Sequence, residues 1–148
     1  MELADKVAID NLIAAYARCV DTPDYAALGR MFASGEITAN VRGDRLVGEE
    51  QVRTFYSTTN RTHADGTART HHIVTNFEYH AVSPRDVRVD SCFTVLQGTD
   101  TLPLQPIVAG RYNDVFIKDK GGWRFASKHI IVSHLGNLSE HLTITLTT

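Results

Sequence analysis

Two adjacent histidines, His71 and His72, are the residues of this sequence best suited to proton transfer. They lie in a run of β-branched and aromatic residues between Thr70 and Tyr79 that contains no glycine or proline, which predicts a β-strand. Successive side chains of a strand point to opposite faces, so only one of the two can face an enclosed site. Because imidazole has an ordinary pKa of about 6.5, the inward histidine is a candidate general base. The alternative is that both are structural residues with satisfied hydrogen bonds.

The polar residues that could accompany such a histidine come from the same strand and from the first helical segment. If His72 points inward, Asn76 shares its face, because the two are four residues apart in a strand. Helical periodicity over residues 2–21 places Tyr16 on the inward stripe, and Asp21 follows at the end of the helix. A carboxylate there is on the unfavourable side of the helix dipole, so Asp21 is either a solvated loop residue or a functional one. The stripe consists of Ile9, Leu12, Ile13, Tyr16 and Val20.

The elements that would position these residues are helices in the first half of the chain and strands in the second. Helices are expected at 2–21, 25–32 and 48–57, and strands at 36–41, 70–82, 87–97, 104–117 and 123–132. Helices followed by a long antiparallel meander predict an α+β fold. We expect a cone-shaped, curved antiparallel sheet wrapped around the N-terminal helices, with an interior pocket. Residues 133–148 are expected to form a tail that pairs with a neighbouring subunit or covers the pocket mouth.

Length and composition predict a single domain over residues 1–148, with 43% hydrophobic and 22% charged residues. The net charge of −2 gives no basis for binding nucleic acid or an anionic membrane surface. No apolar run approaches the roughly 20 residues of a membrane span, and the acidic start is unlike a signal peptide. Cys19 and Cys92 lie far apart in the sequence and read as free thiols. These features predict a cytoplasmic protein.

Motifs for metals, nucleotide cofactors and covalent catalysis are not found in the sequence. The seven histidines show no ligand spacing such as HxH or HExxH, so no metal is expected. No glycine-rich phosphate loop follows a predicted strand, and neither serine nor cysteine lies in a nucleophile motif such as GxSxG. We therefore expect chemistry that uses no cofactor.

Three segments resemble the SnoaL-like branch of the nuclear-transport-factor-2-like superfamily. They are the end of the first helix, Tyr16–Asp21, the strand His72–Asn76, and a late hairpin that contains Gly-Gly-Trp-Arg-Phe at residues 121–125. This branch includes scytalone dehydratase, bile-acid 7α-dehydratase and hexachlorocyclohexane dehydrochlorinase. The resemblance extends from about residue 5 to about residue 133 and implies the same cone-shaped fold.

The resemblance also implies roles for individual residues. It places His72, rather than His71, in the position of a general base, and Asp21 in the position of the residue that orients the base. A carboxylate bonded to one ring nitrogen fixes the tautomer and stabilises the imidazolium that forms. Tyr16 corresponds to a tyrosine that bonds the substrate's oxygen. The alternative is a core tyrosine whose hydroxyl is satisfied by the backbone.

Further substrate-binding positions follow from the same resemblance and from strand parity. The arginine that assists the leaving group in the dehydrochlorinase corresponds here to Lys128 or to a place next to His129. Asn76 is expected in the pocket wall. Arg111 and Asp114 have opposite parity on one strand, so at most one of them lines the pocket, and we expect Arg111 as a substrate-binding candidate. The second strand histidine of scytalone dehydratase has no counterpart around residues 95–97.

The resulting prediction is a cofactor-free lyase, with dehydratase-like elimination, or an isomerase that acts on a small, hydrophobic, cyclic substrate. The alternative is a non-catalytic ligand-binding or assembly module, like the small subunit of ring-hydroxylating dioxygenases. Contact between His72 and Asp21 beside a cavity would favour the enzyme, whereas separation by packed core residues would favour the module. The resemblance and a second, partly apolar sheet face also predict a homo-oligomer, either a trimer or a dimer.

Overall fold

A single six-stranded sheet with strand order β2-β1-β6-β5-β4-β3 forms the framework of the computed structural model, which describes residues 1–147. The helices are α1 (Leu3–Asp21), α2 (Tyr25–Met31) and α3 (Gly48–Thr59). The strands are β1 (Glu36–Ala39), β2 (Arg45–Val47), β3 (Thr70–Ser83), β4 (Asp86–Gln97), β5 (Gln105–Asp119) and β6 (Gly122–Leu135). Within residues 1–147, no helix combines the length and the apolar character needed to cross a lipid bilayer.

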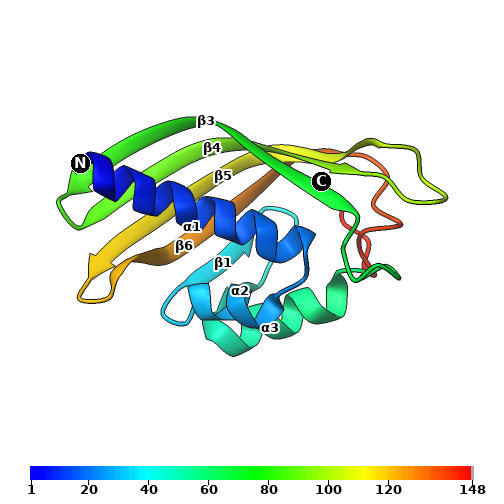
Figure 1. Ribbon diagram of the computed structural model, residues 1–148, viewed down its shortest axis with the longest axis horizontal. Coiled ribbons are helices and arrows are strands. Elements are labelled where there is room, and N and C mark those ends of the chain that lie inside the picture. Colours follow the sequence, from blue (N-terminus) through cyan, green and yellow to red (C-terminus); the bar gives the residue numbers. More distant parts are fainter. Residues whose placement is uncertain (148) are drawn as a thin grey trace.

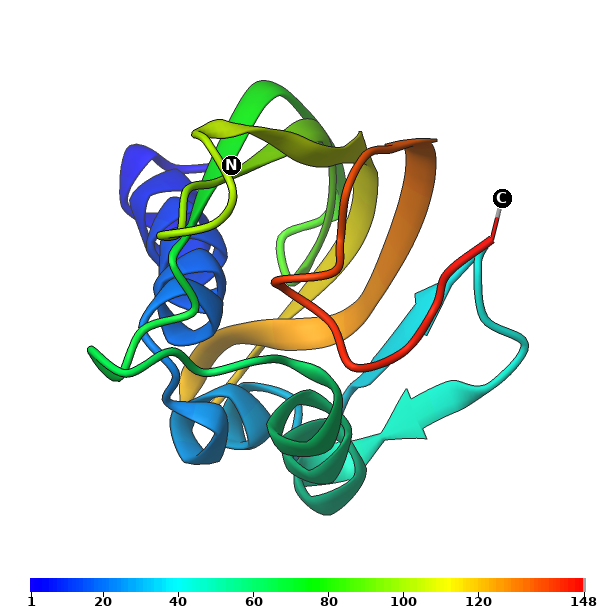
Figure 2. The same ribbon diagram turned by 90° about the vertical axis from the view of Figure 1, so that its right-hand side faces the viewer.

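The four long strands β3–β6 curve around helix α1, as predicted for an α+β fold with a bent sheet (Figure 1). Turned by 90°, the molecule shows α2 and α3 below the sheet and the C-terminal segment across the open side (Figure 2). The sheet is mixed rather than purely antiparallel, because β1 pairs parallel to β6. This pairing was not predicted, since β1 joins the sheet after two helices and not through a hairpin.

Helix α1 is held at both of its ends by aspartates. Near its start, Asp5 accepts hydrogen bonds from Lys118 Nζ at 2.7 Å and from the Trp123 indole at 2.8 Å, both in the β5–β6 hairpin. At its end, Asp21 is bonded to β3. The face between these anchors is apolar and packs against the sheet, as the helical periodicity predicts. Its buried residues are Ile9, Ile13, Tyr16, Ala17 and Val20.

A β-bulge in β3 changes which side chains face the interior. The pairing of β3 with β4 shifts between Thr75 and Glu78, and Asn76 has a left-handed backbone with φ 57°. The extra residue breaks the alternation of the strand. Before the bulge His72 lines the interior, whereas after it Tyr79 does, where its hydroxyl donates to Asp10 of α1. Asn76 is exposed, so the expectation that it shares the face of His72 is corrected by the bulge.

Candidate functional site

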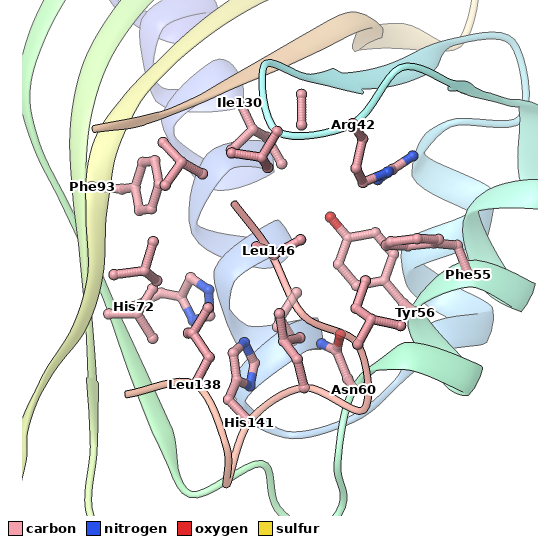
Figure 3. Close-up of a pocket in the computed structure, with 18 of the residues that line it drawn as sticks. Arg42, Phe55, Tyr56, Asn60, His72, Phe93, Ile130, Leu138, His141 and Leu146 are labelled. Carbon is pink, nitrogen blue, oxygen red and sulfur yellow. The ribbon is translucent and has the colours of Figure 1, made fainter. Parts of the chain in front are cut away.

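A cavity of about 120 Å³ lies between the concave face of the sheet, helices α1 and α3 and the C-terminal segment (Figure 3). Its walls are mainly apolar, with side chains such as Val20, Phe93, Val95, Val132, Leu142 and Leu146. A few polar side chains interrupt this surface: Tyr16, Arg42, Tyr56, Asn60, His72, Tyr112 and His141. An apolar cavity of about 150 Å³ accepts benzene, so the smaller space here limits a guest to one small ring at most.

His72 and Asp21 form the closest polar contact on the cavity wall. The Asp21 Oδ1 atom lies 2.5 Å from His72 Nδ1 and also accepts a hydrogen bond of 2.7 Å from the Thr70 hydroxyl. The Oδ2 atom accepts the backbone N–H of His72 at 2.9 Å. Helix α1 ends at Asp21, so this carboxylate reaches the first residues of β3 directly. One side chain thus fixes both the ring and the backbone of His72.

The charge on Asp21 is stabilised by these contacts. Burial raises the pKa of the Asp21 carboxyl, but the hydrogen bonds from His72 and Thr70 and the attraction of His72 outweigh it, and the pKa lies below its ordinary value. A carboxylate on Nδ1 favours the tautomer with its proton on that nitrogen. The other nitrogen, Nε2, is then an acceptor, and the His72 ring lies on the cavity wall (Figure 3). This is the arrangement of a general base.

Two tyrosines supply hydroxyl groups to the same cavity. The hydroxyl oxygens of Tyr16 and Tyr56 are 2.7 Å apart, and both residues are almost completely buried. Burial raises the pKa of Tyr16 well above its ordinary value and that of Tyr56 to about 12, so both phenols are neutral. Only one of their two hydroxyl protons is used in the bond between them. Tyr112 lines the same cavity beside Tyr16, so the other proton can be taken by the Tyr112 hydroxyl or by an oxygen atom of a ligand.

Tyr56, Arg42 and His141 also line the cavity, but the sequence did not indicate them as site residues. The Arg42 guanidinium stacks on the ring of Phe55, with its centre 3.9 Å from the ring centroid. Tyr56 is one of the buried residues of α3, and burial in a helix does not distinguish a core residue from a site residue. His141 follows the last strand, where no periodic pattern indicates a direction for its side chain. Only tertiary packing brings these residues to one cavity.

Lys128 was expected to bind substrate, but it is enclosed in the core. Its Nζ atom lies 3.0 Å from Asp114 Oδ2, and neither side chain has any exposed surface. The same ammonium lies 3.4 Å from the ring centroid of Tyr112 and 4.4 Å from that of Tyr16. Lys128 does not line the cavity, because the carboxylate and the aromatic rings occupy its surroundings.

The other two expected substrate-binding residues on β5 and β6 point away from the cavity. His129 lies next to Lys128 in β6 and therefore faces the opposite side, where its Nδ1 is 2.7 Å from the Thr38 hydroxyl. Arg111 is exposed, next to the buried Tyr112. Strand alternation accounts for both corrections.

Outside the cavity, one histidine belongs to a cluster of side chains that could bind a metal ion. His71 is exposed, on the face opposite to His72. His80 Nε2 lies 3.3 Å from Asp90 Oδ2, and Glu78 is nearby. Within residues 1–147 these three are the only cluster with the spacing of metal ligands. All three are far more exposed than His72 and belong to a charged patch on the sheet surface.

Solved structures similar to this chain share its fold at low sequence identity. The hexachlorocyclohexane dehydrochlorinase LinA-type3 from Novosphingobium barchaimii has 20% identity and a TM-score of 0.72, over 93% of this chain and 92% of that chain. A protein from Novosphingobium aromaticivorans provisionally identified as a scytalone dehydratase has 20% identity and a TM-score of 0.71, over 89% of this chain and 86% of that chain.

A third similar structure carries a different assignment. It is provisionally identified as the beta subunit of an aromatic-ring-hydroxylating dioxygenase from Novosphingobium aromaticivorans, with 18% identity, a TM-score of 0.72, and coverage of 97% and 100%. At such identities these likenesses establish the fold alone. No curated protein sequence is significantly similar to the chain. The profile of the SnoaL-like domain, however, matches residues 1–129, and the chain therefore belongs to the SnoaL-like family.

Proposed function

We propose that this protein is a lyase that eliminates water or another small leaving group from a cyclic substrate by general-base catalysis. The observation that carries the proposal is the contact of 2.5 Å between Asp21 and His72 Nδ1 on the wall of a cavity. A base oriented in this way is typically worth about 10²- to 10⁴-fold in rate. The dehydrochlorinase and dehydratase among the similar structures agree with this class of reaction.

The proposed step begins with His72. Its Nε2 atom takes a proton from a ring carbon next to a carbonyl or another electron-withdrawing group. The electron pair of the broken C–H bond forms a C=C bond, and the leaving group departs from the adjacent carbon with its own bonding pair. A hydroxyl leaving group takes the proton from the His72 imidazolium and departs as water, which returns His72 to its neutral form. A hydroxyl group of the Tyr16–Tyr56 pair donates a hydrogen bond to the oxygen atom that gains negative charge. Asp21 stabilises the imidazolium during this step. Return of the proton to a different carbon would give an isomerisation instead.

The size and lining of the cavity support a small, mainly apolar substrate. A volume of about 120 Å³ limits the substrate to one small ring at most. The wall offers few polar groups. These groups would fix the orientation of the bound ring, and the apolar wall would supply most of the contact area.

Two reactions test the proposal with single-ring compounds. We expect the protein to accelerate loss of water from 3-hydroxycyclohexanone, followed by the absorbance of the conjugated product, or loss of chloride from hexachlorocyclohexane. His72→Ala and Asp21→Asn should each lower the rate by about 10²-fold or more. His71→Ala is the matched control and should leave the rate unchanged, since His71 is exposed on the other face. No acceleration of either reaction, or full activity in His72→Ala, would contradict the proposal.

A second candidate function is a non-catalytic assembly module, favoured by the likeness to the dioxygenase beta subunit. Exposed apolar side chains on β3, including Ile73 and Phe77, offer a surface for a partner or a second copy of the chain. Such a module would need neither an oriented imidazole nor a cavity, so the enzyme is the better-supported proposal.

A further inference from the structure

His141 is a second imidazole beside the cavity, and the mechanism described above does not use it. It comes from the C-terminal segment, far from β3 in sequence, and its ring centroid lies 6.5 Å from that of His72, at an interplanar angle of 68°. In Figure 3 the two side chains approach the same space from different segments. Because this separation is small, neighbouring atoms of one ligand can contact both rings.

The ring nitrogens of His141 have no hydrogen-bond partner among residues 1–147. Only 7% of the residue is exposed, and its Nδ1 atom is buried without a hydrogen-bond partner. Its backbone, in contrast, is bonded to Leu138 and Arg61. A nearby histidine behaves differently, since His63 Nε2 is 2.9 Å from the Glu140 carbonyl oxygen. A buried polar group without a hydrogen-bond partner destabilises the folded state, so its retention beside a cavity points to a ligand.

The charge state of His141 limits what it can bind. Burial, followed by the repulsion of His72, lowers its pKa to about 4. The ring is therefore neutral near pH 7, with one N–H donor and one acceptor nitrogen. A neutral imidazole in an apolar site can donate to a carbonyl or hydroxyl oxygen without introducing a second charge next to His72.

We propose that His141 hydrogen-bonds an oxygen atom of the substrate beside the carbon that His72 deprotonates, so that the cavity selects oxygenated ring compounds over hydrocarbon or chlorinated rings of equal size. This inference rests on the proposed function, and it narrows the substrate class to ring ketones and ring alcohols. Residues 95–97 of strand β4 contain no histidine, so the second imidazole at this cavity comes from the C-terminal segment.

Matched probes test the selectivity without knowledge of the natural substrate. The dissociation constants of cyclohexanone, methylenecyclohexane and chlorocyclohexane are measured by titration calorimetry for the wild type and three variants. The wild type should prefer cyclohexanone, and His141→Phe should reduce that preference roughly fivefold to tenfold, the value of one hydrogen bond. His141→Gln, which keeps polar atoms, should restore part of it. His134→Phe, at an exposed histidine outside the cavity, should leave the preference for cyclohexanone unchanged.

A spectroscopic measurement on the wild type covers the case in which a variant does not fold. Cyclohexanone should shift the ¹⁵N resonances of the His141 ring, and methylenecyclohexane should not. Equal affinities for the three probes in the wild type, an unchanged preference in His141→Phe, or an unshifted His141 resonance would each overturn the inference. His72→Ala separates the two proposals, because it should lower turnover by about 10²-fold or more while it keeps the preference for cyclohexanone.

Discussion

At the scale of single residues, the site depends on how charges are paired inside the sheet. Asp21 pairs with His72 at the cavity, whereas Asp114 pairs with Lys128 in the core. Burial raises the pKa of Asp114 and lowers that of Lys128, and the attraction between the two partly offsets each shift. Desolvation therefore opposes the charged forms of both residues. The Lys128 ammonium also contacts the rings of Tyr16 and Tyr112 and helps to fix them.

Breaking this core pair should destabilise the protein strongly. Lys128→Met leaves the Asp114 carboxylate buried without a partner, so we expect a loss of about 3–5 kcal/mol in the free energy of unfolding. The double variant Lys128→Met, Asp114→Leu should be closer to the wild type, because no charge remains to be desolvated. Urea denaturation of both variants measures the difference. A double variant as unstable as the single one would show that the pair itself contributes net stability.

The residues of the site could be predicted only in part. Tyr16 and Asp21 follow from helical periodicity and from a resemblance in sequence, and strand alternation shows that only one of His71 and His72 faces the interior. The bulge at Asn76 could not be foreseen, because a single left-handed residue reverses the parity of the strand after it. Lys128 was assigned to the substrate from the resemblance to the dehydrochlorinase, and the sequence does not show that Asp114 of another strand pairs with it in the core.

At the scale of elements, the C-terminal segment forms one wall of the cavity. Its backbone is fixed to the end of α3, since Thr143 N–H donates to the Thr59 carbonyl and Arg61 N–H to the His141 carbonyl, both at 2.8 Å. Leu138, Leu142, Ile144 and Leu146 turn toward the cavity from this segment. The segment was expected to be a tail at an interface or over the mouth, because alternation alone does not show what a strand-like end contacts.

Shortening one of these side chains should enlarge the substrate range. Leu142→Ala removes part of the wall, so the affinity for the bicyclic 2-decalone relative to cyclohexanone should rise, by roughly tenfold if the added space is filled. Titration of both ketones measures the ratio. Leu104→Ala, at a leucine that is 74% exposed, is the control and should leave the ratio unchanged. An unchanged ratio in Leu142→Ala would mean that this segment does not limit the cavity.

At the scale of the whole molecule, the architecture was more predictable than the site. Helices before a meander indicate an α+β fold, and the order of elements and the Gly-Gly-Trp-Arg-Phe hairpin resemble one family. The parallel pairing of β1 with β6 was not predictable, because it depends on where α2 returns the chain and not on any local pattern.

Stability of the whole chain should depend on pH through His141. Its pKa is lowered from an ordinary 6.5 to about 4 in the folded state, where it faces His72, Asp21 and His63. Between these values the unfolded chain binds a proton that the folded chain does not, so stability falls as the pH decreases. The loss is at most roughly 3.5 kcal/mol, at about 1.4 kcal/mol per pKa unit. The lowered pKa of Asp21 also makes the folded state less stable in acid, but only when the pH falls below about 3.8, the ordinary pKa of an aspartate.

The variant His141→Phe removes this titrating group. Its free energy of unfolding, measured in urea at several pH values, should vary less between pH 6.5 and 4 than that of the wild type. The same slope in both proteins would show that other groups account for the acid sensitivity.

The central claim is that Asp21 holds the His72 ring with its proton on Nδ1 and presents Nε2 to the cavity as a base. Nitrogen NMR of ¹⁵N-histidine-labelled protein distinguishes the two tautomers directly and needs no substrate. We expect the Nδ1–H form of His72 in the wild type and loss of this preference in Asp21→Asn. A wild-type ring with its proton on Nε2, or a tautomer that does not change in Asp21→Asn, would contradict the account.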